Sequence, residues 1–138
     1  MKPSALLVTV LPIPGFLYIA WALAPATWGA IHVAGVGLLF AGLALVTLAR
    51  IQLGNAFSVT PQATILVTRG LYSRIRNPIY VFSTIAFAGL FLYMDRPLFL
   101  VALIPVAVMQ FLRARQESKG LEARFGDEYR AYKASTWF

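Results

Sequence analysis

Cysteine is absent from this chain of 138 residues, and histidine occurs once, as His32. The lack of thiols excludes disulfide bonds, iron–sulfur clusters and thiol catalysis. One histidine and five acidic residues also argue against a zinc site, because zinc is held by clusters of such side chains. His32 itself lies in an apolar stretch far from the basic segments, and we interpret it as a packing or hydrogen-bonding residue.

Charge is scarce as well. Charged residues make up only 12% of the chain, whereas hydrophobic residues make up 59% and the mean hydropathy is +0.73. This balance indicates a membrane protein and excludes an ordinary soluble domain. Four spans of roughly 20 residues each would use more than half of the chain, which leaves room for one domain, residues 1–138. We attribute the net charge of +7 to topology and to anionic lipid headgroups, and expect no nucleic-acid partner.

The apolar stretches predict an all-α fold, a polytopic membrane helical bundle with about four transmembrane helices. In the first stretch, Pro12 and Pro14 indicate a kink or a late helix start. Only Asp95 and Arg96 separate the last two stretches, so these form a short helical hairpin. The predicted spans are residues 5–24, 28–49, 79–94 and 97–112.

The first two stretches allow two further interpretations. Lys2 and the small residues near Leu23 resemble parts of a signal peptide, but the two prolines and the length of the apolar run favour a retained span. In the second stretch, small residues recur at four-residue spacing and would let another helix approach closely, in the bundle or in a homodimer. These residues are Ala30, Ala34, Gly37 and Ala41.

The basic residues predict the orientation. The N-terminus, the loop of residues 50–78 and the tail of residues 113–138 together hold eleven of the twelve lysines and arginines, and the opposite side holds only Arg96. By the positive-inside rule, both termini, the loop and the tail are cytoplasmic, at the plasma (inner) membrane if the chain is bacterial. Trp21 and Trp28 then lie near the outer interface, where aromatic belts are expected.

The tail predicts an amphipathic helix. An apolar stripe recurs there at helical spacing and is interrupted by Gly126. We expect this C-terminal helix to lie at the membrane interface under the bundle, where it would close a pocket, although interfacial packing alone explains the same stripe. The stripe consists of Leu121, Phe125, Tyr129 and Tyr132.

The stretch RGLYSRIRNPIYV precedes the third span at the same membrane edge as the tail. Arg69 and Arg74 are explained by topology and by phosphate contacts. Asn77, with the proline after it, is a helix start signal, since asparagine caps helices and proline suits the first turn. Capping leaves Arg76 and Tyr80 unexplained, which indicates a binding site at this edge.

The stretch LGNAFSVTPQATILVTRGLYSRIRNPIYV, then an apolar hairpin and RARQESKGLEARFGDEYRAY, resembles the isoprenylcysteine carboxyl methyltransferase family and its phospholipid methyltransferase relatives. That family carries G-x-Y-x-x-x-R-[HN]-P-x-Y, a helical hairpin, and a basic, glutamate-rich segment leading into L-x-x-x-F-G-x-x-Y-x-x-Y. The likeness covers residues 53–133. The first motif is matched by Gly70, Tyr72, Arg76, Asn77, Pro78 and Tyr80, and the second by Leu121, Phe125, Gly126, Tyr129 and Tyr132.

The resemblance implies a membrane methyltransferase that uses S-adenosylmethionine, held at the cytoplasmic edge between the hairpin and the tail. A lipid-like or isoprenoid acceptor would enter from the bilayer. The implied catalytic residues are Arg76 and Arg113. The implied cofactor-binding residues are Leu71, Tyr72, Arg76, Asn77, Tyr80, Glu117 and Tyr129.

The residue types suit this cofactor, which offers a carboxylate, an ammonium, a ribose, an adenine and a sulfonium. Such a ligand needs a basic donor, an acidic acceptor and aromatic faces. Glu117, the only acid where the last span meets the tail, is either that acceptor or a solvated charge. No strand-associated G-x-G-x-x-G is present, which excludes a Rossmann methyltransferase.

Methyl transfer is a displacement that needs in-line positioning and exclusion of water more than acid and base groups. Because the expected pocket offers no histidine, we expect an acceptor that is anionic or easily deprotonated, such as a carboxylate, oriented by Arg113 or Arg76. The chain departs from the family at Asn77, where many members have histidine, and at Ser118, where a second glutamate is common. These departures leave two alternatives open, a non-catalytic lipid-binding or scaffold protein and an accessory subunit that docks an acidic partner.

Overall fold

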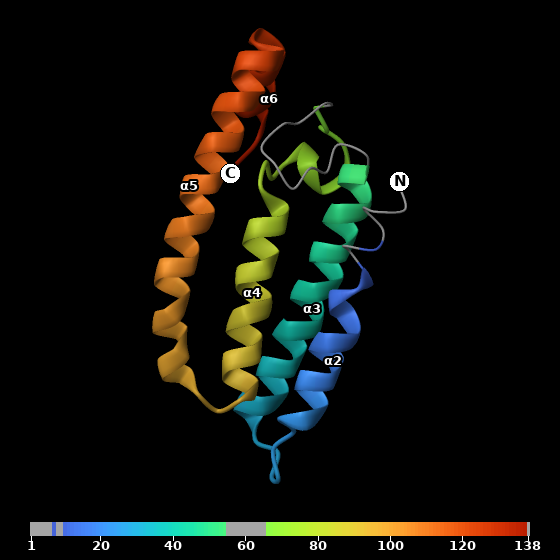
Figure 1. The fold of residues 1–138 in the computed structure, drawn as a ribbon, viewed down its shortest axis with the longest axis vertical. Coiled ribbons are helices and arrows are strands. Elements are labelled where there is room, and N and C mark those ends of the chain that lie inside the picture. The colour runs from blue at the N-terminus through green and yellow to red at the C-terminus, as the bar shows by residue number, and fades with distance from the viewer. Residues whose placement is uncertain (1–6, 8–9, 55–65, 138) are drawn as a thin grey trace.

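The computed structural model describes Leu7, residues 10–54 and residues 66–137, and these form helices and connections without strands (Figure 1). The predicted all-α class is therefore confirmed for the described part of the chain. In chain order the elements are α2 (Pro12–Ala22), α3 (Ala30–Leu53), the short 3₁₀ helix η2 (Gly70–Ser73), α4 (Pro78–Tyr93), the 3₁₀ helix η3 (Pro97–Ala102), α5 (Leu103–Phe125) and α6 (Asp127–Ser135).

Helix α2 begins at Pro12. Proline suits the first helical turn, because its missing N–H would have no partner there. Val10 is also helical, and the interruption falls at Leu11, directly before Pro12. Pro14 lies within the first turn and does not end the helix.

Helix α3 is longer than predicted. It begins at Ala30, and the backbone N–H of Gly29 donates to Nδ1 of His32 at 3.0 Å, so His32 caps the helix start. The helix continues through Arg50 to Leu53 and ends at Gly54, which has a φ of +54°. The helix thus extends past residue 49, where the predicted span ends, because a charged residue marks the end of an apolar run and not the end of a helix.

Helices α3 and α4 pack backbone against backbone through glycines. A Cβ atom placed on Gly89 would collide with the backbone nitrogen of Leu39, and one placed on Gly35 would collide with the backbone nitrogen of Tyr93. At Gly42 an added Cβ would lie 2.7 Å from the backbone nitrogen of Ala86. Such close approach requires residues without side chains at the crossing.

The predicted small-residue face of α3 is not the face that α4 contacts. All four predicted residues are exposed, and a Cβ atom added to Gly37 would meet no other atom within 4 Å. The glycines that do the packing lie one and two positions away on the helix, which turns them to a different face. Whether the exposed face binds a second copy of the chain stays a prediction.

The core lies between α2, α3 and α4. Leu39, Ala86, Leu90 and Tyr93 are buried together, and Ala20 of α2 completes the cluster. The hydroxyl of Tyr93 donates to the backbone carbonyl of Ala20, which joins α4 to α2. The connection between α2 and α3 lies at the same end of the bundle as the turn between α4 and η3 (Figure 1).

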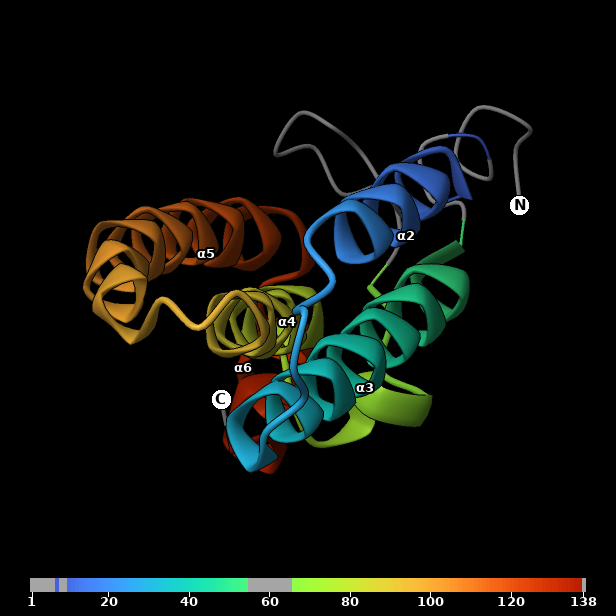
Figure 2. The same ribbon diagram turned by 90° about the horizontal axis from the view of Figure 1, so that it is seen from below.

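The predicted hairpin is present. Helix α4 covers Pro78–Tyr93, one residue earlier at each end than the predicted span. Asp95 has a φ of +54°, and this left-handed residue reverses the chain before η3 and α5 return along α4 (Figures 1 and 2). Phe91 of α4 and Phe99 of η3 stack edge to face, with ring centroids 5.8 Å apart, and so hold the base of the hairpin together.

The last span and the tail are one helix. Helix α5 continues from Leu103 without a break through Arg113 to Phe125, and it extends past the end of α4 (Figure 1). Up to Phe125 the predicted C-terminal amphipathic helix is therefore part of the same helix as the last span, and its place at the membrane interface stays a prediction. The predicted interruption at Gly126 is confirmed, since Gly126 has a φ of +55° and the short helix α6 turns back from it.

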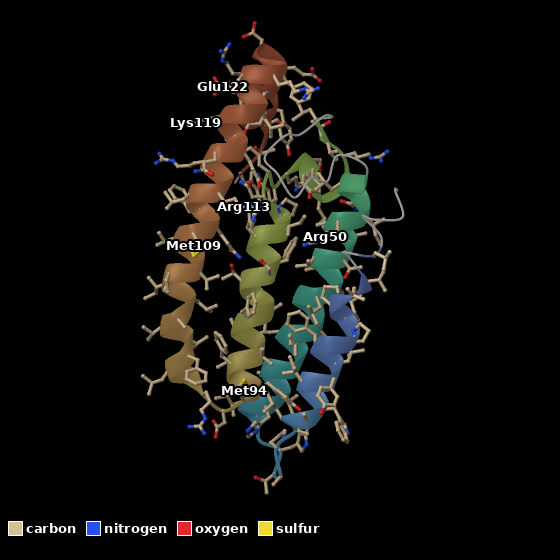
Figure 3. The ribbon with its side chains drawn as sticks, viewed as in Figure 1. Arg50, Met94, Met109, Arg113, Lys119 and Glu122 are labelled. Atoms are coloured by element: carbon tan, nitrogen blue, oxygen red, sulfur yellow. The ribbon has the colours of Figure 1, made fainter. Side chains whose placement is uncertain are left out.

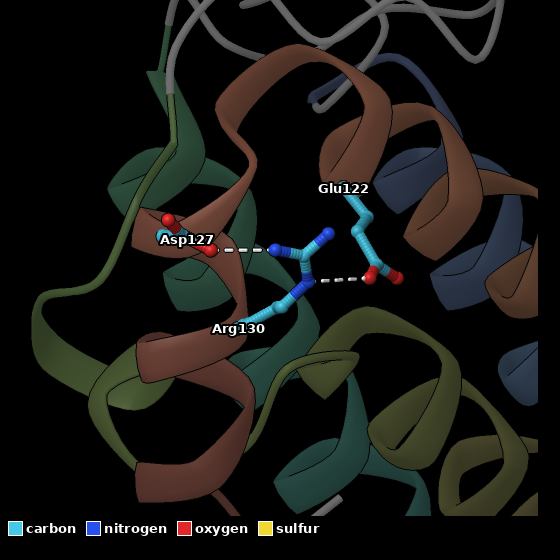
Figure 4. A network of polar contacts seen from close by, with 3 residues as sticks. All are labelled: Glu122, Asp127 and Arg130. Atoms are coloured by element: carbon cyan, nitrogen blue, oxygen red, sulfur yellow. Dashed lines mark hydrogen bonds and ion pairs between the residues drawn. The ribbon is translucent and has the colours of Figure 1, made fainter.

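A charged network holds the turn between α5 and α6. Arg130 of α6 pairs through Nε with Glu122 of α5 at 2.9 Å and through Nη1 with Asp127 at 2.5 Å (Figure 4). The two carboxylates raise the pKa of the Arg130 guanidinium. These side chains are exposed, so the pairs guide the turn more than they stabilise the fold.

Two helical segments are long and apolar enough to cross a membrane, Ala30–Leu53 and Leu98–Phe125. Helices α2 and α4 are apolar but only 11 and 16 residues long. The four-span bundle and its orientation thus stay predictions. Arg50 and Arg113 lie toward one end of the bundle and Met94 lies toward the other (Figure 3).

Candidate functional site

The two motif segments meet between α4 and α5. Tyr80, in the first turn of α4, donates its hydroxyl to Oε1 of Glu117 on α5 at 2.5 Å. The hairpin causes this meeting, because it returns α5 along α4 and places residues that are distant in sequence at the same height. Both side chains are half-buried, so the pair is partly accessible.

Arg113 completes this cluster. It lies one helical turn before Glu117, and its Nε is 3.4 Å from the same carboxylate oxygen that Tyr80 contacts. The arginine side chain is 54% exposed, which leaves its guanidinium accessible to an anionic group. We call Tyr80, Arg113 and Glu117 the acidic cluster.

Arg76 lies in a second group, where it holds the C-terminal segment. Its Nη1 donates to the backbone carbonyl of Lys133 at 3.0 Å and to Oγ1 of Thr136 at 3.1 Å. Its Nε is buried and has no hydrogen-bond partner in the described part of the chain. A buried donor without a partner is costly, so this N–H is a position where a ligand oxygen would be favoured.

Tyr72 connects the two groups. It is 6% exposed, and its backbone carbonyl accepts a hydrogen bond from the hydroxyl of Tyr132 at 2.6 Å. Burial raises the pKa of the Tyr72 hydroxyl well above its usual value, and the charges of Tyr132, Glu117 and Tyr80 act in the same direction. Tyr72 therefore lies in electrostatic reach of the acidic cluster as a neutral hydroxyl.

The Tyr132 hydroxyl also stays protonated. Burial raises its pKa to about 12, and Tyr129 adds to the shift. Tyr132 is thus a permanent donor to the Tyr72 carbonyl at physiological pH. Next to it, the backbone N–H of Trp137 donates to the Arg74 carbonyl at 2.8 Å, so the end of the chain lies along the η2 segment.

We expect Tyr132→Phe to loosen α6 from the η2 segment. The change removes one buried hydrogen bond, which lowers the free energy of unfolding of this region by about 1 kcal/mol. The check is the rate at which trypsin cleaves after Arg130 and Lys133 in α6, which should rise several-fold. The control is Ser135→Ala, which removes only a local bond to the Tyr132 carbonyl. Equal cleavage rates for Tyr132→Phe and the parent chain would contradict this role of the hydroxyl.

The η2 segment is itself anchored to α3. The backbone N–H of Leu71 donates to Oε1 of Gln52 at 2.7 Å. Gly70 has a φ of +62°, and an added Cβ there would collide with the Gln52 side chain. Leu71 thus contributes to the site through its backbone, and its predicted cofactor contact stays a prediction.

Asn77 occupies the N-cap position of α4 and Pro78 follows as its first residue, as the helix start signal predicts. The Asn77 side chain makes no capping hydrogen bond, however. Its amide is therefore not used by the helix, and a role toward a ligand stays a prediction.

Tyr129 of α6 is buried against α5, and its predicted cofactor contact stays a prediction. It is 1% exposed, and its hydroxyl donates to Oγ of Ser118 at 2.8 Å. Its ring packs edge to face on Tyr132, with ring centroids 6.2 Å apart. Ser118, the departure from the usual second glutamate, thus serves the contact between α5 and α6.

Sequence reasoning missed three polar residues between α4 and α5. Oγ1 of Thr84 lies 2.8 Å from Oε1 of Gln110, and Nε2 of Gln110 donates to Oγ of Ser83 at 3.1 Å. A signal was available, since all three interrupt otherwise apolar spans, where polar side chains are expensive and commonly functional.

One family of known proteins matches most of this chain. A model of the family described as phospholipid methyltransferase matches residues 30–128, more than two thirds of the chain. The match runs from the start of α3 into α6 and includes the η2 segment and the acidic cluster. Comparisons with curated proteins and with solved structures return no match. The match over most of its length shows that the chain belongs to the phospholipid methyltransferase family, a group of membrane methyltransferases.

Proposed function

We propose that this protein transfers a methyl group from S-adenosylmethionine to an anionic group of a lipid-like acceptor that enters from the bilayer. The observation that supports this most is the hydrogen bond between Tyr80 and Glu117. It joins the two motif segments across facing helices and sets a carboxylate beside the guanidinium of Arg113. The carboxylate of Glu117, the guanidinium of Arg113 and the hydroxyl of Tyr80 suit a charged cofactor. The apolar helices beside them suit a lipid acceptor.

The residues present fit the cofactor. The Glu117 carboxylate would accept hydrogen bonds from its ammonium or ribose hydroxyls, and the unpartnered Nε–H of Arg76 would donate to its carboxylate. Tyr80 and Tyr72 offer aromatic faces for its cationic and ring portions. When bound, the cofactor supplies a methyl group on a positively charged sulfur, which a nucleophile can attack directly.

The work left to the protein is positioning. Arg113 would hold the acceptor's anionic group by a charge-assisted hydrogen bond and aim it in line with the methyl group. The docked α6 would keep water from the reacting groups, since Tyr132 and Arg76 hold it against the η2 segment. An already ionised acceptor needs no base, which agrees with the capping role of the only histidine.

The acceptor class decides between this proposal and its nearest alternative. The family description names phospholipids, and a phospholipid amine would have to lose a proton before attack. The only histidine of the chain, His32, caps the start of α3 and is not placed to take that proton. We therefore favour a carboxylate or another anionic acceptor over an amine.

The test is methyl transfer from radiolabelled S-adenosylmethionine to palmitate, hexadecylamine and hexadecanethiol by the protein in lipid nanodiscs. We expect methylation of palmitate, and a roughly 10- to 100-fold lower kcat/KM for palmitate in Arg113→Gln, because a charged hydrogen bond is lost. The matched control is Arg115→Gln, since Arg115 is exposed on the same helix and lies over the ring of Phe111. Strong activity on hexadecylamine with none on palmitate or the thiol would overturn the proposed acceptor class.

A further inference from the structure

The polar cluster of Ser83, Thr84 and Gln110 lies in a part of the bundle that should be apolar. Ser83 and Thr84 come from α4 and Gln110 from α5, and all three are half-buried. The hydroxyls of Ser83 and Thr84 also lie 3.1 and 2.9 Å from the backbone carbonyl of Tyr80. The cluster is therefore continuous with the acidic cluster through Tyr80.

One N–H group of the Gln110 side-chain amide has no hydrogen-bond acceptor within this cluster. The Gln110 amide carries two N–H groups, and one of them donates to Ser83. Within the described part of the chain the other N–H makes no hydrogen bond. Turning the amide over exchanges its partners but still leaves one N–H without an acceptor. In an apolar setting an unmet N–H favours a ligand oxygen.

The position of this donor relative to Arg113 matches an amphiphile. Gln110 and Arg113 are three residues apart on α5, so they share a face and differ in height by about 4.5 Å. Beyond Gln110, the same side of α4 carries half-buried phenylalanines, Phe87 and Phe91, with ring centroids 6.4 Å apart. Along α4 and α5 the side chains thus change from cationic at Arg113 to neutral polar at Gln110 and to apolar at the two phenylalanines.

Helix α5 has fewer buried residues than α3 or α4. Ala114 is the only buried residue of α5, whereas α3 and α4 touch through their backbones. Side-chain hydrogen bonds that join α5 to α4 include those of Tyr80 with Glu117 and of Gln110 with Thr84 and Ser83. A clamp that served only to fix α5 would gain most from full burial and full pairing, and Gln110 has neither.

We infer that Gln110, held by Ser83 and Thr84, is a subsite for a carbonyl oxygen in the stem of the methyl acceptor. This rests on the proposed function and names the acceptor more closely: an acyl amphiphile whose ester or amide carbonyl lies about one helical turn from its anionic group. A plain hydrocarbon or isoprenoid chain has no atom for this donor. Gln110 then acts as a specificity-determining residue, and Arg113 holds the reacting end.

The test uses two carboxylates of equal length, palmitoyloxyacetate with an ester carbonyl and hexadecyloxyacetate with an ether in its place. The protein in nanodiscs is incubated with an equimolar mixture, and the two amphiphiles that remain bound are quantified by mass spectrometry. We expect the parent chain to retain roughly 3- to 10-fold more ester than ether, the range of one neutral hydrogen bond. Gln110→Met should bring this ratio to about one.

Two further variants keep the test decisive. Gln116→Met makes the same change at an exposed position of α5 and should keep the parent ratio. If Gln110→Met does not fold, Gln110→Glu keeps the length and the bond from Thr84 but removes the donor, and should also abolish the preference. A ratio of one in the parent chain, or an unchanged ratio in both Gln110 variants, would overturn the subsite. The bound ester-to-ether ratio does not depend on methyl transfer, so it tests the subsite separately from the proposed function. The proposed function is contradicted instead if S-adenosylhomocysteine does not bind.

Discussion

Replacing Glu117 with glutamine is expected to weaken the binding of S-adenosylhomocysteine by about 10- to 100-fold. The substitution keeps the size of the side chain and a hydrogen-bond acceptor for Tyr80, but removes the charge that would hold the ligand's ammonium. Hydrogen bonds to charged groups contribute about 1.5–3 kcal/mol, and each 1.4 kcal/mol changes a dissociation constant tenfold. Calorimetric titration of the detergent-purified protein measures the effect directly.

The chain provides a matched control for this experiment. Glu122 lies on the same helix and is also paired with an arginine, Arg130, but it belongs to the exposed turn between α5 and α6. Glu122→Gln therefore removes the same charge away from the acidic cluster and should bind S-adenosylhomocysteine like the parent chain. Equal losses in both variants would show a general effect of charge. No binding by a folded parent chain would favour the lipid-binding or scaffold alternative.

Gly89→Ala is expected to lower the free energy of unfolding by about 3 kcal/mol. The added Cβ would collide with the backbone of α3 at Leu39, and a backbone cannot move aside as a side chain can. Overpacking of a well-packed contact typically costs 1–3 kcal/mol or more. The check is the melting temperature of the purified protein in detergent.

Gly37→Ala makes the same change at an exposed position of α3, where an added Cβ meets no other atom within 4 Å. Because alanine is the better helix former, this variant should be as stable as the parent or more stable, by up to about 1 kcal/mol. If both variants melt at the same temperature, the backbone contact between α3 and α4 is not the interface that holds the bundle together.

Local signals in the sequence were sufficient for the helix starts and turns. Proline at Pro12 and Pro78, the reversal at Asp95 and the interruption at Gly126 all act within a few residues of themselves. Helices α3 and α5 extend beyond the predicted spans, which end where charge begins. Hydropathy reports where a helix would leave the apolar layer, whereas the backbone stays helical until a residue such as Gly54 stops it.

The candidate site was partly predictable for a different reason. The hairpin alone brings Tyr80 to Glu117, so its recognition in the sequence places the two motifs together. The bonds from Arg76 to the end of α6 could not be predicted, since they depend on how far α5 extends before the chain turns back. The same holds for the α3 contact face, because the sequence of α3 does not say which of its glycines the partner helix will meet.

The unbroken helix α5, from Leu103 to Phe125, has a consequence for how this protein can vary in length. Each residue added to an α-helix turns everything beyond it by about 100° and moves it by about 1.5 Å. One insertion between Gln110 and Gly126 would rotate α6 away from the η2 segment. Relatives should therefore differ here by substitution on the outward surface, while the number of residues separating the acidic cluster from the hinge at Gly126 stays constant.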